Sequence, residues 1–275
     1  MTVREALAQV AERLAAAGCE TPRVDADLLL AHVLGTTRSG VLAEGERLLD
    51  GAEEAELDTL VGRRSAREPL AYVLGEWGFR GLVLDVDARV LVPRPETEIV
   101  VERCLALLAG VAVPRVLDVG TGSGAIALAI ADEHPGAHVT GVDVSRDALE
   151  VARANARRTG LGVEMLEHDL FAGLPEGPWT LVVANPPYVR AGDLDGLRAE
   201  VRDWEPRVAL HAEGATEAVA RGAAAVLEPG GALVLEVADG DAERVAGLLG
   251  ELGYEDVAVT HDLAGRERVV EGQRP

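Results

Sequence analysis

Residues 115–124 read RVLDVGTGSG, in which a short apolar run passes directly into a loop that contains three glycines. The apolar residues 125–131 that follow read as the start of a helix. Near-continuous apolar runs are typical of parallel strands buried on both faces, and glycines let the backbone turn sharply and approach a ligand closely. The stretch therefore predicts a strand, a ligand-binding loop and a helix, the opening unit of a Rossmann-like α/β sheet.

The same alternation continues to the carboxyl end of the chain. The last two apolar runs are separated by only a short loop, which predicts that they form antiparallel neighbours. We therefore predict a mostly parallel α/β sheet with helices on both faces and an antiparallel last strand. Further strands are expected at residues 138–142, 163–167, 180–184, 232–237, 256–260 and 267–270, and helices at 147–158, 216–227 and 242–252.

The residues before this sheet follow other patterns. Val3, Leu7, Val10 and Leu14 fall at helical spacing, and similar patterns recur up to residue 75. Residues 77–92 contain short β-type runs separated by Gly, Asp and Arg, which favours a hairpin. We expect three parts: a small helical domain at residues 1–75, a β-hairpin linker at 76–95 and the α/β domain at 96–275.

Composition narrows the range of partners. The formal net charge is −21 and all 26 basic residues are Arg, which argues against a broad phosphate-binding surface and against direct nucleic-acid binding. No apolar run approaches the length of a membrane span, and charges near the N-terminus interrupt any secretory core, so a cytoplasmic protein is expected. Neither Cys19, Cys104 nor the six histidines show metal-binding spacing, and we predict no metal.

The glycine loop has an acidic partner in Asp143, which follows Gly120 by 23 residues and ends the next strand. A carboxylate there can accept hydrogen bonds from both hydroxyls of a ribose. The loop also fits the fingerprint of dinucleotide-binding proteins. Asp118 favours S-adenosylmethionine over a dinucleotide, because its carboxylate would repel a pyrophosphate but suits the ammonium of a methionine. We therefore predict S-adenosyl-L-methionine as cofactor. The candidate binding residues are Asp118, Gly120, Thr121, Gly122, Ser123, Gly124 and Asp143.

A third cofactor-binding element is expected after the third strand. Asp169 could accept a hydrogen bond from an adenine amino group, with the backbone of Leu170 beside it. For Phe171 we expect a core position.

The loop after the fourth strand reads Asn185-Pro186-Pro187-Tyr188 and is the most specific pattern in the chain. Ligands of such sheets bind beyond the carboxyl ends of the strands, so this loop should face the glycine loop. The Asn185 side-chain oxygen and the Pro186 carbonyl offer two acceptors, which match the two hydrogens of a planar amino group. Tyr188 can lie against the flat face of an amide or a base. We predict that Asn185, Pro186 and Tyr188 act in catalysis, and that Asn185 and Pro186–Tyr188 bind the substrate, with Asn185 also near the cofactor.

Several functions use parts of this pattern. A DNA adenine-N6 methyltransferase would need the same loop, together with a basic face that the sequence does not indicate. A nicotinamide-dependent oxidoreductase would explain the glycine loop but not residues 185–188, and a non-catalytic cofactor-binding module would not need them.

The motifs together resemble the release factor glutamine methyltransferase family. Residues 67–75, REPLAYVLG, and 90–98, VLVPRPETE, resemble two further signatures of that family, and all the motifs occur in its order. The resemblance implies S-adenosylmethionine-dependent methylation of the amide nitrogen of the glutamine in the Gly-Gly-Gln motif of class I peptide chain release factors. It also implies that residues 1–75 bind the substrate and 96–275 form the methyltransferase domain.

The resemblance leaves some points open. Residues 94–98 either close over the methionine end of the cofactor or only rigidify the linker and start a helix. Leu170 stands where some members carry an aromatic residue, and residues 210–219 and 236–240 match only loosely. A ribosomal protein is an alternative substrate, because close relatives with the same loop methylate one.

Overall fold

The computed structural model describes residues 1–275, which divide into two compact units. The first comprises Met1–Glu76 and Arg198–Trp204, and the second comprises Trp77–Leu197 and Glu205–Pro275. The segment Arg198–Trp204 is therefore part of the helical unit, although the sequence placed it within the α/β domain.

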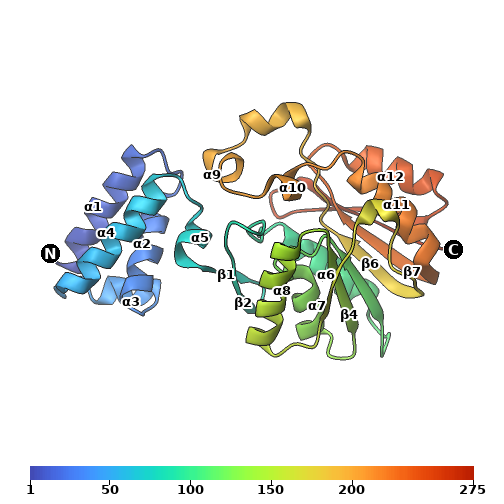
Figure 1. Ribbon diagram of the computed structural model, residues 1–275, viewed down its shortest axis with the longest axis horizontal. Coiled ribbons are helices and arrows are strands. Elements are labelled where there is room, and N and C mark those ends of the chain that lie inside the picture. Colours follow the sequence, from blue (N-terminus) through green and yellow to red (C-terminus); the bar gives the residue numbers. More distant parts are fainter. The chain divides into compact units, whose positions relative to one another are not determined.

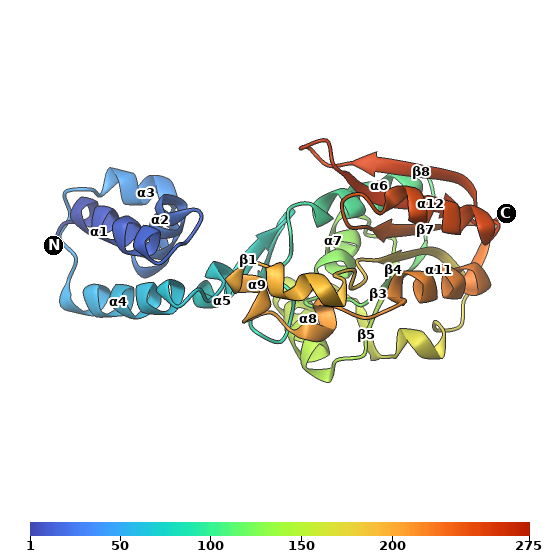
Figure 2. The ribbon, with the colours of Figure 1, turned by 90° about the horizontal axis from the view of Figure 1, so that it is seen from above.

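The first unit is a cluster of helices around its own apolar core (Figures 1 and 2). Capping boxes begin two of its helices, because the side chains of Thr2 and Asp50 accept hydrogen bonds from backbone N–H groups that the first turn leaves free. Figure 2 shows α4 running alongside α1 and leading into α5. The helices are α1 (Val3–Ala16), α2 (Pro22–Val33), α3 (Arg38–Ala43), α4 (Gly51–Ser65), α5 (Leu70–Leu74) and α9 (Ala199–Arg202).

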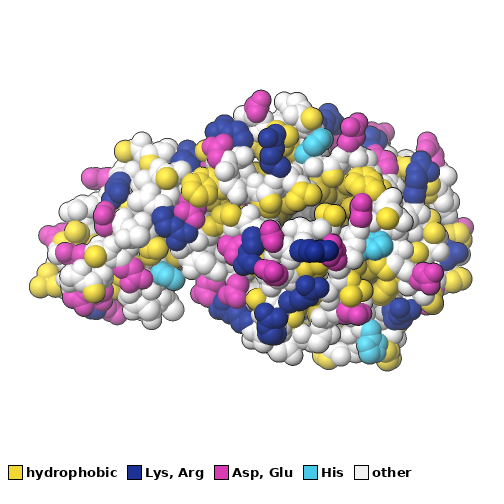
Figure 3. Space-filling view, in the orientation of Figure 1, with side chains coloured by type: hydrophobic (Ala, Val, Ile, Leu, Met, Phe, Trp, Pro, Cys, Tyr) yellow, Lys and Arg dark blue, Asp and Glu magenta, His cyan; other side chains and the backbone are white.

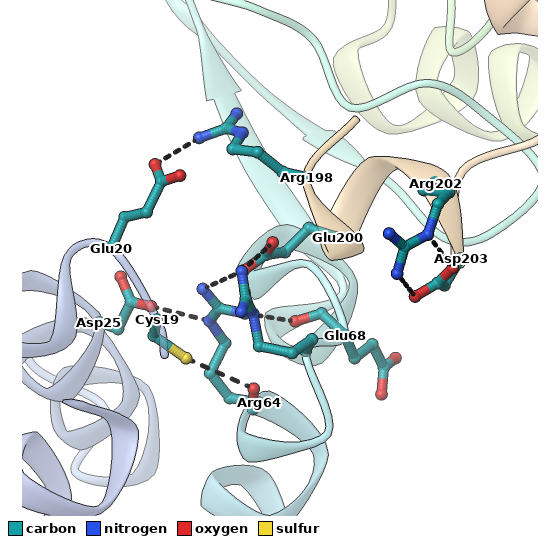
Figure 4. Close-up of polar contacts among 10 residues, drawn as sticks. Cys19, Glu20, Asp25, Arg64, Glu68, Arg198, Glu200, Arg202 and Asp203 are labelled. Atoms are coloured by element: carbon teal, nitrogen blue, oxygen red, sulfur yellow. Dashed lines mark hydrogen bonds and ion pairs between the residues drawn. The ribbon is translucent and has the colours of Figure 1, made fainter. Parts of the chain in front are cut away.

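The segment Arg198–Trp204 is held to the other helices of this unit by ion pairs (Figure 4). Glu200 receives hydrogen bonds from Arg67 at 2.8 and 2.6 Å and from Arg64 at 3.0 Å. Arg64 is buried and also binds Asp25 at 2.7 Å. Two segments more than 130 residues apart in the sequence are thus joined by charge-assisted hydrogen bonds.

The second unit is built on a seven-stranded sheet with the order β5-β4-β3-β6-β7-β9-β8. Strands β3 to β7 are parallel, whereas β9 runs antiparallel to both β7 and β8, as the sequence predicts. Strand β7 begins at residue 227, five residues before the predicted start, because Leu227 already pairs with Trp179 across an irregularity in register. The strands are β3 (Arg115–Val119), β4 (His138–Asp143), β5 (Glu164–Glu167), β6 (Trp179–Ala184), β7 (Leu227–Glu236), β8 (Glu255–His261) and β9 (Glu267–Gln273).

Helices cover both faces of this sheet, each over its own apolar core. Strand residues alternate between the cores, so Val116 and Leu117 point to opposite faces. One core is covered by α6 (Thr97–Leu107), α7 (Ala125–Glu133), α8 (Arg146–Thr159) and the hairpin of β1 (Glu76–Phe79) and β2 (Leu82–Asp85); the other is covered by α11 (Ala215–Val226) and α12 (Ala242–Glu251). The short segments η1 (Leu170–Ala172), η2 (Ala191–Gly196) and α10 (Arg207–Leu210) complete the unit.

Candidate active site

The glycine loop is tied to the neighbouring strand of the sheet. The backbone N–H groups of Gly120 and Thr121 both donate to the carbonyl of Val142 at the end of β4, at 2.8 and 2.9 Å. Gly122 has a φ of 56°, which L side chains rarely adopt, and a Cβ atom added there would meet no atom within 4 Å. The loop thus presents bare backbone to open space beyond the carboxyl ends of β3 and β4.

Asp143 ends β4 beside this loop. One of its carboxylate oxygens accepts from the N–H of Gly122 and the other from the N–H of Ser145, both at 2.9 Å. Each oxygen keeps a lone pair, so the carboxylate can still accept from two hydroxyl groups of a ligand. Burial raises the pKa of Asp143, and the two N–H donors oppose that effect.

Asp118 lies below the loop and does not line the cavity described next. Its Oδ2 accepts from the Thr121 hydroxyl at 2.6 Å and from the Ala127 N–H at 3.2 Å, while its buried Oδ1 has no partner. Burial raises the pKa of Asp118 to about 7. These contacts make Asp118 a support of the loop and of the start of α7, and its direct contact with a methionine ammonium stays a prediction.

A cavity beyond the carboxyl ends of the parallel strands brings most of the predicted residues together. It contains about 1090 Å³ of empty space, open solvent at its mouth included. Figure 3 shows a hollow on this face, with hydrophobic side chains around it and arginines mixed with acidic side chains beside it. The predicted residues that line the cavity are Gly120, Thr121, Gly122, Ser123, Asp143, Asp169, Leu170, Asn185 and Pro187.

Asn185 follows β6 and faces this cavity with a defined set of contacts. Its side-chain nitrogen donates to the Thr97 hydroxyl at 3.3 Å, and Thr97 in turn donates to the Glu236 carboxylate at 2.6 Å. Because the nitrogen of the Asn185 amide is engaged by Thr97, its oxygen remains as an acceptor for a ligand.

The other residues of the Asn185–Tyr188 loop lie around Asn185 without lining the same cavity. Pro186 is buried, and Tyr188 borders a second hollow together with Pro187 and His211. The Tyr188 hydroxyl donates to Glu236 at 3.3 Å. Burial and the nearby Glu236 charge raise the pKa of Tyr188, so its side chain stays a neutral phenol at physiological pH.

The expectation of a core position for Phe171 is wrong. The residue is 56% exposed and lines the cavity, next to Asp169 and Leu170. The reason is local: η1 follows directly after Asp169, whose carboxylate accepts from the Phe171 N–H at 2.9 Å, so this short turn projects the ring away from the sheet.

Two segments complete the cavity. Residues 89–94 and Thr97 line one side, and residues 206–212 contribute Pro206, Val208, Ala209 and Ala212. Arg94 joins these segments, because it binds both oxygens of the buried Glu205 at 2.7 and 2.6 Å. Arg94 and Thr97 border the cavity and α6 begins at Thr97, so the expected helix start is confirmed, whereas closure of residues 94–98 over the methionine end of the cofactor stays a prediction. The second segment lacked a sequence signal, because its apolar residues follow neither helical nor strand spacing for long.

Two family models match parts of this chain. Residues 5–75 match the family model of the PrmC N-terminal domain, and residues 97–200 match that of the methyltransferase small domain. The release factor glutamine methyltransferase of Deinococcus radiodurans is 45% identical over 100% of this chain and 99% of the relative. The chain belongs to the release factor glutamine methyltransferase family. The enzyme of that name from Geobacter sulfurreducens is 39% identical over 99% of this chain and 96% of the relative.

Solved structures show the same fold. A 16S rRNA N2 G1207 methyltransferase of Thermus thermophilus, solved with AdoMet and guanosine, aligns with a TM-score of 0.55 and 22% identity over 73% of this chain and 50% of that one. A methyltransferase of Pyrococcus furiosus aligns with a TM-score of 0.50 and 19% identity over 70% of this chain and 89% of that one. Membership of a methyltransferase family removes the oxidoreductase and the non-catalytic module from the alternatives. None of the helices combines the length and the apolar character that spanning a membrane would require.

Proposed function

We propose that this chain transfers a methyl group from S-adenosylmethionine to the side-chain amide nitrogen of a glutamine in class I peptide chain release factors. The observation that carries the proposal is the position of Asn185, which lines the same cavity as Gly120, Gly122 and Asp143 and whose amide nitrogen is engaged by Thr97, so that its oxygen remains as an acceptor. The relatives' shared name supplies the substrate. An enzyme acting on a translation factor would work in the cytoplasm.

The residues of the cavity fit the cofactor. Asp143 has acceptor capacity for the two ribose hydroxyls. Asp169 can accept from the adenine amino group, and the exposed ring of Phe171 offers a flat apolar surface beside it. The bare backbone of the glycine loop leaves room for the methionine part, with Thr121 and Ser123 in the loop. When bound, the cofactor supplies an electrophilic methyl group on a positively charged sulfur.

The chain's own residues would then position the acceptor nitrogen. An amide nitrogen is a weak nucleophile because its lone pair is delocalised. If Asn185 Oδ1 and the Pro186 carbonyl accept its two N–H bonds, the lone pair points along the line of the methyl group. That lone pair would accept the methyl group, the sulfur of the cofactor would keep the electron pair of its former bond to the methyl carbon, and the amide would lose a proton past Asn185 Oδ1 or the Pro186 carbonyl to water. Such positioning can contribute roughly 7–11 kcal/mol, and no separate base is required.

The helical unit at residues 1–75 would hold the release factor. It matches the N-terminal family model and has a core of its own, and it contributes no residue to the cavity. Two substrates with the same chemistry remain as outcomes of the test, a glutamine of a ribosomal protein and the adenine amino group of DNA.

Mapping the methylated atom tests the proposal. Purified protein, isotopically labelled S-adenosylmethionine and the two release factors are mixed, and peptides are examined by mass spectrometry. We expect label on the Gly-Gly-Gln glutamine. The Asn185→Ala variant should lose transfer by about 100-fold or more, as when one hydrogen-bonding group of an active site is removed, while still binding the cofactor. Label on a ribosomal protein or on DNA instead, or unchanged transfer by Asn185→Ala, would contradict the proposal.

A further inference from the structure

A buried carboxylate lies behind the proposed acceptor group. Glu236 ends β7, is 1% exposed and does not line the cavity. One of its oxygens accepts from the Thr97 hydroxyl at 2.6 Å and the other from the Tyr188 hydroxyl at 3.3 Å. Thr97 begins α6 and is itself buried. The end of β7, the start of α6 and the loop after β6 thus meet at one carboxylate.

The hydrogen bonds in this group have a fixed direction. Thr97 has one hydroxyl proton, and the short contact commits that proton to Glu236. Its oxygen can then only accept from the side chain of Asn185, and it does so from the Asn185 nitrogen at 3.3 Å. Burial raises the pKa of Glu236, whereas the Thr97 hydrogen bond and the charge of Arg268 oppose that effect. A carboxyl group in either protonation state still offers Thr97 an acceptor oxygen.

This direction matters for the chemistry. The two ends of an Asn amide have nearly the same shape, so sterics alone do not decide which end faces the cavity. If the nitrogen of the Asn185 amide faced the cavity, Asn185 would present N–H groups to the N–H groups of the substrate amide. Two donors facing each other repel, and the substrate would lose one of the two acceptors that orient its lone pair. Some other group must therefore select the orientation.

We propose that Glu236 and Thr97 are positioning residues, which together hold the Asn185 amide with its oxygen toward the substrate nitrogen. The inference rests on the proposed function. Glu236 acts through Thr97 and holds the Tyr188 ring beside the same loop, so a single buried side chain orders both sides of residues 185–188.

A purely structural role makes a different prediction. Buried polar groups are ordinarily hydrogen-bonded, and breaking such a pair lowers stability wherever it occurs. In that case the loss of activity would follow the loss of folded protein. A positioning role instead lowers kcat of the folded enzyme and leaves cofactor binding in place.

The matched variants Thr97→Val and Thr97→Ser distinguish a positioning role from a purely structural role. Valine keeps the shape but removes the hydroxyl, and serine keeps the hydroxyl. We expect Thr97→Val to lower kcat for a release factor by about 10- to 100-fold, the size of effect that misplacing a reacting group produces, with the cofactor Kd changed by less than about threefold. Thr97→Ser should retain most of wild-type kcat.

The controls are the melting temperature of each variant and the cofactor Kd from calorimetry. The inference is overturned if Thr97→Val turns over as fast as Thr97→Ser, or if the kcat of both falls only in proportion to the folded fraction. It is also overturned if Thr97→Val acts on the cofactor Kd alone. Absence of transfer by the wild-type chain would overturn the proposed function as well, so the two failures are distinguishable.

Discussion

At the scale of single residues, Asp118 is a group whose burial has a measurable consequence. Its pKa in the fold is about 7, above the ordinary 3.8, because it is buried. A carboxyl with a raised pKa contributes most stability at low pH, and that contribution is lost as the pH rises through 7. Asp118→Asn, which mimics the neutral acid, should therefore become more stable relative to wild type between pH 4 and 7, by up to about 1.4 kcal/mol per pH unit.

Urea unfolding of the cofactor-free protein at several pH values measures this difference. Because every other titrating group is shared, the difference between variant and wild type isolates Asp118. A difference that stays constant from pH 4 to pH 8 would contradict the raised pKa.

At the scale of one element, two glycines of the same loop separate cofactor contact from packing. Gly122 and Gly124 both have positive φ, of 56° and 83°, so alanine costs each of them backbone strain of about 1 kcal/mol or more. A Cβ on Gly122 would enter open space at the cavity. A Cβ on Gly124 would lie 3.1 Å from Leu128 Cδ1 and 3.2 Å from Met165 Cε. We expect Gly122→Ala to weaken cofactor binding by about tenfold or more, since the backbone can no longer approach the ligand.

Gly124→Ala serves as the matched control, with the larger fall in melting temperature and the smaller change in cofactor Kd. Calorimetric titration and thermal unfolding of both variants test the contrast. The opposite order of the two effects would show that the ligand does not approach the backbone at Gly122.

At the scale of the whole molecule, the chain leaves the second unit at Leu197 and returns to it at Glu205 after a passage through the helical unit. The hydrogen bonds from Arg67 and Arg64 to Glu200 hold the segment Arg198–Trp204 in place (Figure 4). Arg67 adopts a φ of 67°, a strained conformation for a residue other than glycine. Although partial burial opposes them, these bonds lower the pKa of Glu200 to about 2. Glu200→Gln should destabilise the helical unit by about 2 kcal/mol, less than the cost of breaking a fully buried pair.

Hydrogen exchange of the α4 amides measures this loss in the full chain. Because the pKa of Glu200 is lowered in the fold, its contribution is present above about pH 4.5 and is lost as the pH falls toward 2. The difference in the stability of the helical unit between variant and wild type should therefore become small in acid. Glu20→Gln, which breaks the exposed pair with Arg198, is the control and should cost less than about 0.5 kcal/mol. Equal effects of the two variants would contradict a special role for Glu200.

The sequence by itself determined the features that depend on local pattern. The apolar run and glycines of residues 115–124, the strand–helix alternation and the short loop before β9 predicted the sheet and its antiparallel strand, all of which the structure confirms. The position of Asn185 after β6 followed from the same rule, because parallel strands end at one edge of a sheet. Hydrophobic periodicity and turn-forming residues act over a few neighbouring residues, so both can be recognised in a single sequence.

Only the tertiary structure decided which side chains meet. Glu236 and Thr97 are 139 residues apart, Thr97 and Asn185 are 88 apart, and Glu200 and Arg64 are 136 apart. Phe171 faces outward although its residue type favours a core. Strand order, register and the docking of helices on the sheet bring such groups together, and these depend on the free energy of the whole packed chain, not on the pattern of any one segment.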